Sequence, residues 1–201
     1  THHHTDHVDG NLRLKKKYGS KIIGFSLDKD RIPGIDILLK ENQNYKIGNL
    51  EFKVIFVPGH TKGHIAFFFS KNKVVFTGDT LFSLGCGRVF EGSHKEMFSS
   101  LNKIRNLPRD TKIYCGHEYT KSNLDFCMKY DPDNKFLKDK AIHIQKKLSA
   151  GQPTIPSTID QEIKTNIFLR CSDTIIKQTL NLANSAEDEV FSKLRDLKDS
   201  F

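Results

Sequence analysis

The segment THHHTDH, residues 1–7, carries the pattern H-x-H-x-D-H at the start of the chain. In an extended segment neighbouring side chains point to opposite sides, so His2 and His4 point the same way and His3 points away. If the chain turns after His4, Asp6 and His7 come toward the same region. Three imidazoles and one carboxylate then form a ligand set suited to Zn²⁺ or iron. Alone, the segment is also compatible with a polar tail or a purification-tag remnant, although such tags are usually longer uninterrupted histidine runs.

Three further windows place a histidine or an aspartate directly after an expected strand. They are GHTKGH at 59–64, TGDT at 77–80 and CGH at 115–117. Apolar runs at 54–57, 73–76 and 112–114 predict the strands, which end just before His60, Asp79 and His117. One such residue alone is more often a turn or cap residue, but loops at strand ends are also where α/β proteins place their chemistry. Together with the first segment, the windows predict a metal site.

Composition narrows the class of protein. Apolar residues make up 37% and charged residues 28% of the 201 residues, which predicts a folded core rather than disorder. The longest apolar run, 65–69, is far shorter than a membrane helix, and no signal peptide is visible. The net charge of +8 is spread along the chain, so we expect an anionic small-molecule substrate and no nucleic acid or membrane partner. The four cysteines form no C-x-x-C pair, which predicts free thiols in a reducing, cytoplasmic compartment. We also expect a monomer.

These motifs together resemble the metallo-β-lactamase superfamily. Within it, the chain is similar to the hydroxyacylglutathione hydrolases, also called glyoxalase II, along its whole length. The segments that carry this similarity are THHHTDH at 1–7, FTGDTLF at 76–82, GCGRVFEG at 85–92 and YCGHEYT at 114–120.

The resemblance implies a centre of two metal ions, most simply Zn²⁺, with iron or manganese as alternatives. It implies His2, His4 and His60 as ligands of the first ion, and Asp6, His7 and His117 as ligands of the second. Asp79 would bridge the two ions, and Asp6 and Asp79 would be the carboxylates of the catalytic centre. His3 would be structural, and His64 would support the ligands rather than bind metal.

The implied reaction is hydrolysis of S-(2-hydroxyacyl)glutathione, typically S-D-lactoylglutathione, to glutathione and D-lactate, as in methylglyoxal detoxification. In the family, a hydroxide that bridges the metal ions attacks the thioester carbonyl. The leaving thiolate has a parent pKa of roughly 8.5, so no strong general acid is required. The substrate would be bound by residues that match two motif loops and the closing Arg-x-x-Lys-Asp pattern, namely Arg88, Phe90, His117, Tyr119, Arg195 and Lys198. The family commonly has tyrosine at position 90, so Phe90 keeps the ring and loses a hydroxyl contact.

The expected fold is α/β (α+β): a metallo-β-lactamase-like αββα sandwich followed by a helical domain. We place the metal-binding domain at 1–118 and a helical substrate-binding domain at 119–201. The family normally has roughly fifty residues before the first motif, so the sandwich is expected to be truncated at its N-terminus, with the first ligands on a fraying end. Further strands are expected over 21–25 and 64–69, and helices over 11–18, 94–106, 123–130, 134–150, 158–166, 174–184 and 186–198.

Two other functions stay open on the sequence. One is another enzyme of the same fold, such as a lactonase, a persulfide dioxygenase or a nuclease. The other is an inactive remnant that only binds metal. The closing Arg195 and Lys198 pattern and the YCGHEYT loop favour the thioester hydrolase over the first, and the two complete ligand sets argue against a single-iron dioxygenase.

Overall fold

A mixed six-stranded sheet forms the centre of the computed structural model, which describes residues 1–201. The strand order is β10-β9-β6-β5-β4-β3, and all neighbours pair antiparallel except β6 and β9, which are parallel. The strands are β3 (Asn44–Ile47), β4 (Leu50–Phe56), β5 (Ile65–Phe69), β6 (Val74–Gly78), β9 (Lys112–Cys115) and β10 (Ser157–Thr158).

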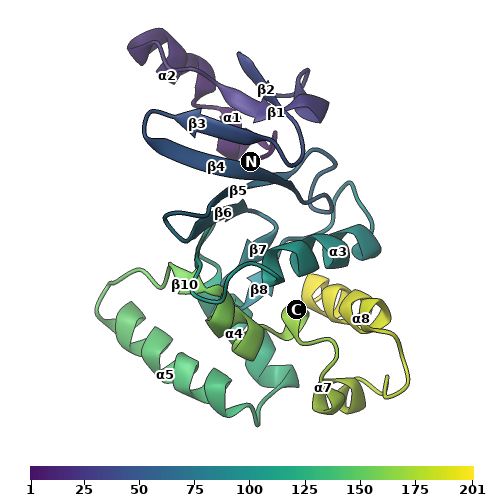
Figure 1. Cartoon of the computed structure of the whole chain (residues 1–201). Coiled ribbons are helices and arrows are strands. Elements are labelled where there is room, and N and C mark those ends of the chain that lie inside the picture. The colour runs from purple at the N-terminus through teal and green to yellow at the C-terminus, as the bar shows by residue number, and fades with distance from the viewer.

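A smaller layer formed by the first forty residues packs on one end of this sheet (Figure 1). It holds a parallel pair, β1 (Ile23–Phe25) and β2 (Ile37–Leu39), with α1 (Thr5–Val8), α2 (Asn11–Tyr18) and the 3-10 helix η1 (Ser26–Asp28). Phe25 of β1 and Leu39 of β2 are buried against Phe52, Val54 and Ile65 of the large sheet. Apolar burial of this kind fixes the layer on the sheet.

The C-terminal part of the chain is helical and lies below the sheet in the view of Figure 1. It consists of α4 (Thr120–Tyr130), α5 (Lys135–Ser149), α6 (Ile159–Thr165), η2 (Ile167–Leu169), α7 (Thr174–Thr179) and α8 (Glu187–Asp199). The helix α3 (His94–Arg105) precedes it in sequence and lies beside α8. Local capping explains where two helices start, because Ser93 with Glu96 and Thr158 with Gln161 form capping boxes.

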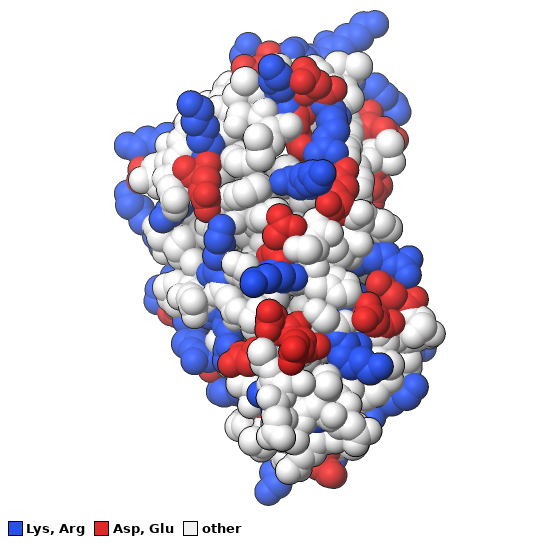
Figure 2. All heavy atoms as spheres, turned by 90° about the vertical axis from the view of Figure 1, so that its right-hand side faces the viewer, with Lys and Arg blue, Asp and Glu red and all other residues white.

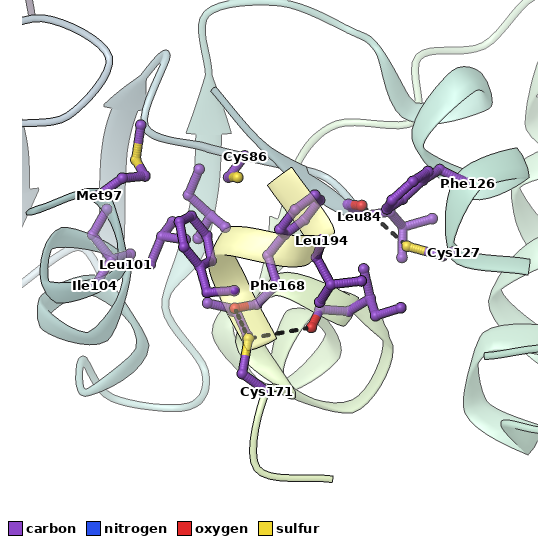
Figure 3. Close-up of a cluster of buried hydrophobic side chains, with 14 of the residues drawn as sticks. Leu84, Cys86, Met97, Leu101, Ile104, Phe126, Cys127, Phe168, Cys171 and Leu194 are labelled. Atoms are coloured by element: carbon purple, nitrogen blue, oxygen red, sulfur yellow. Dashed lines mark hydrogen bonds between the residues drawn. The ribbon is translucent and has the colours of Figure 1, made fainter. Parts of the chain in front are cut away.

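One hydrophobic cluster of 24 buried residues joins the sheet to the helices. Figure 3 shows Met97, Leu101 and Ile104 of α3 on one side of it and Phe126 of α4 on the other. A two-residue pair of strands, β7 (Leu81–Phe82) and β8 (Gly85–Cys86), enters the cluster from the sheet side. The core is therefore continuous across residue 119, and the division into domains at 1–118 and 119–201 stays a prediction.

Most of the expected elements are present, and the helix expected over 11–18 has those bounds, while several others end differently. The helix expected over 174–184 ends at Thr179, because Asn181 takes a left-handed conformation (φ 58°) that a helix cannot continue. The strand expected over 54–57 begins earlier, at Leu50. Neither β2 nor β3 was expected: β3 has only partly buried and exposed side chains, so it lacks an apolar run.

The surface carries both signs of charge. Figure 2 shows basic and acidic side chains interleaved over one face, without a large patch of one sign. Within the lysine run at 15–17, Lys15 pairs with Asp36 at 2.7 Å. None of the helices is both long enough and apolar enough to cross a membrane.

Phe168 tests how much the shared core contributes to stability. Its side chain is buried and packs on the rings of Phe126 and Phe191, at centroid distances of 5.8 and 5.9 Å. Truncation of a buried phenylalanine costs about 3–5 kcal/mol, so Phe168→Ala should lower the free energy of unfolding by about that amount. Phe136→Ala is the matched control, because Phe136 is 57% exposed and should change stability by about 0.5 kcal/mol or less. Equal losses in urea denaturation would contradict this account of the core.

Candidate metal centre

The order of strands brings the predicted site residues to one edge of the sheet. Because β6 and β9 are parallel neighbours, their carboxyl ends meet, and Asp79 and His117 follow directly after these ends. The strand β5 is antiparallel to β6, so its first residue lies at the same edge, just after His60 and His64. The windows that are distant in the sequence therefore converge for a topological reason.

The first segment is attached to this edge by a backbone hydrogen bond. The amide of Ile65 at the start of β5 donates to the carbonyl of Thr1 at 2.9 Å. The chain is extended at His4 (φ −61°, ψ 145°) and then turns into α1. This turn carries Asp6 and His7 back toward the side of His2 and His4, the arrangement expected from the H-x-H-x-D-H pattern.

The predicted ligands form three overlapping groups in which possible ligand atoms lie within 4.8 Å of one another. One group is His2, His4 and His60, and the second is Asp6, His7 and His117. The third, His2, His7 and Asp79, connects the first two. All seven residues that the resemblance implied as ligands are brought together.

Asp79 lies between the first two groups. Its Oδ1 is 3.4 Å from Nε2 of His7, while its Oδ2 is 3.3 Å from Nε2 of His117 and 3.6 Å from Nε2 of His60. Within the groups, the Nε2 atoms of His7 and His117 are 3.2 Å apart, and Nε2 of His60 is 3.0 Å from Nδ1 of His4. A carboxylate in this position can contact two cations at once.

The chemistry of these side chains fits metal ions. Nε2 of His2 and Oδ1 of Asp79 are buried and have no hydrogen-bond partner within the protein, which is costly for polar atoms unless a cation contacts them. Burial lowers the pKa of His2, of His4 and of His60, so the imidazoles are neutral and can offer a lone pair.

Hydrogen bonds from outside the cluster orient two of its members. Nδ1 of His60 donates to the carbonyl of Arg88 at 2.8 Å, which directs Nε2 into the cluster. The amide of Asp79 donates to Nε2 of His64 at 3.1 Å, so the Nδ1–H of His64 faces the hydroxyl of Thr80 at 3.2 Å. His64 is fully buried and contacts Asp79 through the backbone, in agreement with the supporting role expected for it.

A second network holds the first segment from the opposite side. His3 points away from the cluster, and its Nδ1 is 3.3 Å from Oδ2 of the buried Asp28. Arg31 donates to Asp28 and to Glu91, both at 2.5 Å. A Cβ at Gly63 would lie 2.0 Å from the Asp28 carboxylate, so only glycine fits there. Sequence reasoning missed this network because its members lie far apart and match no motif.

A cavity of about 270 Å³ opens directly on the cluster, and a second one of about 320 Å³ continues from it toward α8. Phe82, Arg88 and Tyr119 line both. Tyr119 stacks on His117 with ring centroids 5.1 Å apart, and Phe90 packs edge-on against His60 at 5.3 Å. Both rings are more than half exposed. The residues expected to bind substrate therefore line two adjacent cavities beside the ligand cluster.

Two of the expected substrate residues differ sharply in exposure. Arg195 is only 4% exposed, and its Nη1 donates to the carbonyl of Cys86 at 2.9 Å. Lys198 is half-buried and donates from Nζ to the carbonyl and hydroxyl of Ser122 at 3.1 and 3.0 Å. Burial, together with the neighbouring guanidinium of Arg195, lowers the pKa of Lys198. This cavity wall is thus positively charged, and Lys198 forms no ion pair in it.

Asp199 is a further residue of the second cavity to which sequence reasoning assigned no role. Its Oδ1 accepts from Nε of Arg88 at 3.1 Å and from Nη2 of Arg195 at 3.0 Å. Asp199 is the last residue of the Arg-x-x-Lys-Asp pattern, so the motif could have indicated its role in the cavity. The guanidinium of Arg88 therefore already has a carboxylate partner, whereas the ammonium of Lys198 has none.

The fold and site together define a class. Residues 1–117 match the family model of the metallo-β-lactamase superfamily. Two solved structures share the fold. ETHE1 from Myxococcus xanthus has a TM-score of 0.64 at 22% identity, over 98% of this chain and 67% of that one. The BLEG-1 B3 metallo-β-lactamase has a TM-score of 0.61 at 23% identity, over 84% of this chain and 74% of that one. The chain has the metallo-β-lactamase fold, which implies a two-metal site.

The remaining residues identify the family within this class. Residues 118–201 match the model described as hydroxyacylglutathione hydrolase C-terminus. Proteins named hydroxyacylglutathione hydrolase are 54% identical in Pelagibacter ubique and 48% identical in Chelativorans sp., in each case over all 201 residues. The alignments cover 78% and 79% of those relatives. The chain belongs to the hydroxyacylglutathione hydrolase family, as the motifs indicated.

Gly116 provides a test of the position of Asp79. A Cβ at this residue would lie 2.3 Å from Oδ1 of Asp79 and 2.8 Å from Cε1 of His7. Gly116→Ala should displace the carboxylate, and elemental analysis should find fewer bound metal ions per chain than in the unsubstituted protein. Gly48→Ala is the control, because no heavy atom lies within 4 Å of a Cβ placed at Gly48. Its φ of +57° disfavours alanine, so this variant should lose about 1 kcal/mol of stability but no metal. Full metal content in Gly116→Ala would refute the arrangement.

Proposed function

We propose that this chain hydrolyses S-(2-hydroxyacyl)glutathione, typically S-D-lactoylglutathione, to glutathione and D-lactate. The observation that carries the proposal is that seven ligand-type side chains lie beside a cavity whose far wall is lined by Arg88, Arg195 and Lys198. A glutathione thioester has its reactive carbonyl on the sulfur of the central cysteine and a carboxylate at each end of the tripeptide, so metal ligands with cationic side chains some distance away suit it. The names of the relatives agree with this function.

His2, His4 and His60 would hold one metal ion, and Asp6, His7 and His117 the other, with Asp79 shared. When bound, two such ions supply Lewis acidity at the carbonyl oxygen and lower the pKa of water. Imidazole and carboxylate ligands suit Zn²⁺, and also iron or manganese. We propose Zn²⁺ as the native metal.

The chain's own residues would position the substrate. The ammonium of Lys198 lies at the cavity wall without a carboxylate partner, so it would bind a glutathione carboxylate. Arg88 would contribute less, because Asp199 already pairs with it. The exposed rings of Phe90 and Tyr119 would contact the acyl and cysteinyl parts beside the metal cluster.

Arg195 would act mainly through the position of its neighbours. Its guanidinium is buried, donates to Cys86 and Asp199, and lies 5.2 Å from the centroid of the Phe168 ring. Its positive charge raises the potential of the wall against which Lys198 lies. We therefore assign direct binding of the carboxylate to Lys198 and support of the wall to Arg195.

The chemical step needs no strong acid from the protein. Water loses a proton and adds to the thioester carbonyl, and the C–S bond breaks. Glutathione leaves as a thiolate that takes up a proton from solvent, because the thiol pKa is roughly 8.5, and the hydroxy acid ionises. The proton released from water passes to solvent through the open cavity. A cytoplasmic location, supported by the four free cysteines, and a monomeric state also belong to this proposal.

Lys198→Ala tests the substrate assignment. A charge-assisted contact of about 1.5–3 kcal/mol corresponds to a rise of roughly tenfold or more in KM for S-D-lactoylglutathione. A neutral thioester without glutathione should show little change. Steady-state kinetics on both substrates measures the difference.

Lys193→Ala is the matched control, because Lys193 is exposed on the same helix and lines neither cavity. It should leave both KM values unchanged. If Lys198→Ala and Lys193→Ala have the same KM for S-D-lactoylglutathione, Lys198 is an ordinary surface lysine and the proposed binding of the carboxylate is wrong.

A further inference from the structure

Glu162 of α6 is a fully buried carboxylate that the proposed reaction does not use. Its oxygens accept from the amide of Leu84 at 2.7 Å, from Nδ2 of Asn166 at 3.0 Å and from Nζ of Lys140 at 2.6 Å. Removing a carboxylate and an ammonium from water is costly, and buried ion pairs are often no more stabilising than apolar residues of the same size. Stability alone therefore explains this arrangement poorly.

The group that Glu162 holds is the turn between β7 and β8. Leu84 in this turn has a left-handed backbone (φ 60°), although it is not glycine. Such a conformation costs about 1–3 kcal/mol and persists only where the surroundings enforce it. Figure 3 shows Leu84 beside Phe126 and Cys127 of α4, whose thiol donates to the carbonyl of Leu84 at 3.2 Å.

Other polar side chains of the helical part bind the same two-stranded hairpin, residues 81–86. Nδ2 of Asn123 donates to the carbonyl of Ser83 at 3.1 Å, and Nδ2 of Asn166 donates to that of Gly85 at 3.0 Å. We call Asn123, Glu162 and Asn166 the hairpin clasp. Each of them is at most 5% exposed, and each bonds to backbone groups of the hairpin, so the clasp fixes its position in more than one direction.

The two ends of the hairpin lead directly into the metal centre. Asp79 lies two residues before it, and the carbonyl of Arg88, which orients His60, lies two residues after it. The amide of Gly87 donates to the carbonyl of Thr80 at 3.2 Å and closes the loop. A Cβ at Gly87 would lie 1.9 Å from the carbonyl oxygen of Asp79, so the ends cannot shift independently.

We infer that Glu162 is a positioning residue of the metal centre. Through the hairpin clasp, the helical part holds the hairpin so that Asp79 and His60 keep the orientation needed to bind metal. The inference rests on the proposed role of these two residues as ligands. It gives the helical part a second task besides substrate binding.

Metal affinity of the full chain, measured by competition between the protein and a chelator for Co²⁺ and Zn²⁺, tests this inference. Glu162→Gln keeps the shape of the side chain but removes its charge and one acceptor oxygen, and Asn123→Ala removes a bond on the opposite side of the hairpin. Loss of groups that orient metal ligands typically weakens binding by about 10–100-fold, and we expect at least tenfold for Glu162→Gln. The visible absorption spectrum of the Co²⁺-loaded protein should also change, because it reports the ligand geometry.

Ile176→Ala is the matched control for stability. Ile176 is fully buried in α7, which carries no residue of the hairpin clasp. It should lower Tm but leave the affinity and the Co²⁺ spectrum unchanged. If Glu162→Gln does not fold, Asn123→Ala carries the test alone.

Three results would overturn the inference. In the first, both clasp variants bind metal as tightly as the unsubstituted protein and have the same Co²⁺ spectrum. That result would refute the role of the clasp but not the proposed metal centre. In the second, every variant, the control included, loses metal affinity in proportion to its fall in Tm. The clasp would then contribute only to stability. Failure of the unsubstituted protein to bind Co²⁺ or Zn²⁺ would contradict both the inference and the proposed metal centre.

Discussion

The buried carboxylate of Asp79 is the constraint on which the rest of the site depends. It is 6% exposed, its oxygens face imidazoles of both ligand groups, and its Oδ1 has no hydrogen-bond partner. A buried carboxylate oxygen without a hydrogen-bond partner is costly unless a cation contacts it. The arrangement therefore suits metal ions, and we propose that the surrounding structure holds Asp79 where two ions can share it.

Strand pairing and two glycines in the adjoining loops place Asp79 in this position. The parallel pairing of β6 with β9 places Asp79 beside His117, and the antiparallel pairing with β5 brings His60 to the same edge. Close approach of the loops then requires residues without Cβ at Gly87 and Gly116. The helical part shares a continuous, close-packed core with the sheet, which is consistent with our inference that it helps to hold the ligands in place.

The seven ligand-type residues could be predicted from the sequence because each follows a local signal: the H-x-H-x-D-H segment, or a strand end. Residues whose partners are distant in the sequence could not be predicted in this way. Glu162 and Asp28 look like ordinary surface carboxylates in sequence, and only the fold buries them beside Leu84 and Gly63. Arg195 belongs to the closing motif, but no periodicity could show that its guanidinium is turned inward to Cys86. Local patterns predict which residues meet, whereas burial is decided by the tertiary structure.

Anomalous X-ray diffraction from Zn²⁺-loaded crystals tests the central claim most directly. The account predicts two zinc peaks per chain, with Asp79 in contact with both. One peak should lie among nitrogen atoms of His2, His4 and His60, and the other among the side chains of Asp6, His7 and His117. A single peak, or a second peak away from Asp79, would contradict the shared two-metal centre.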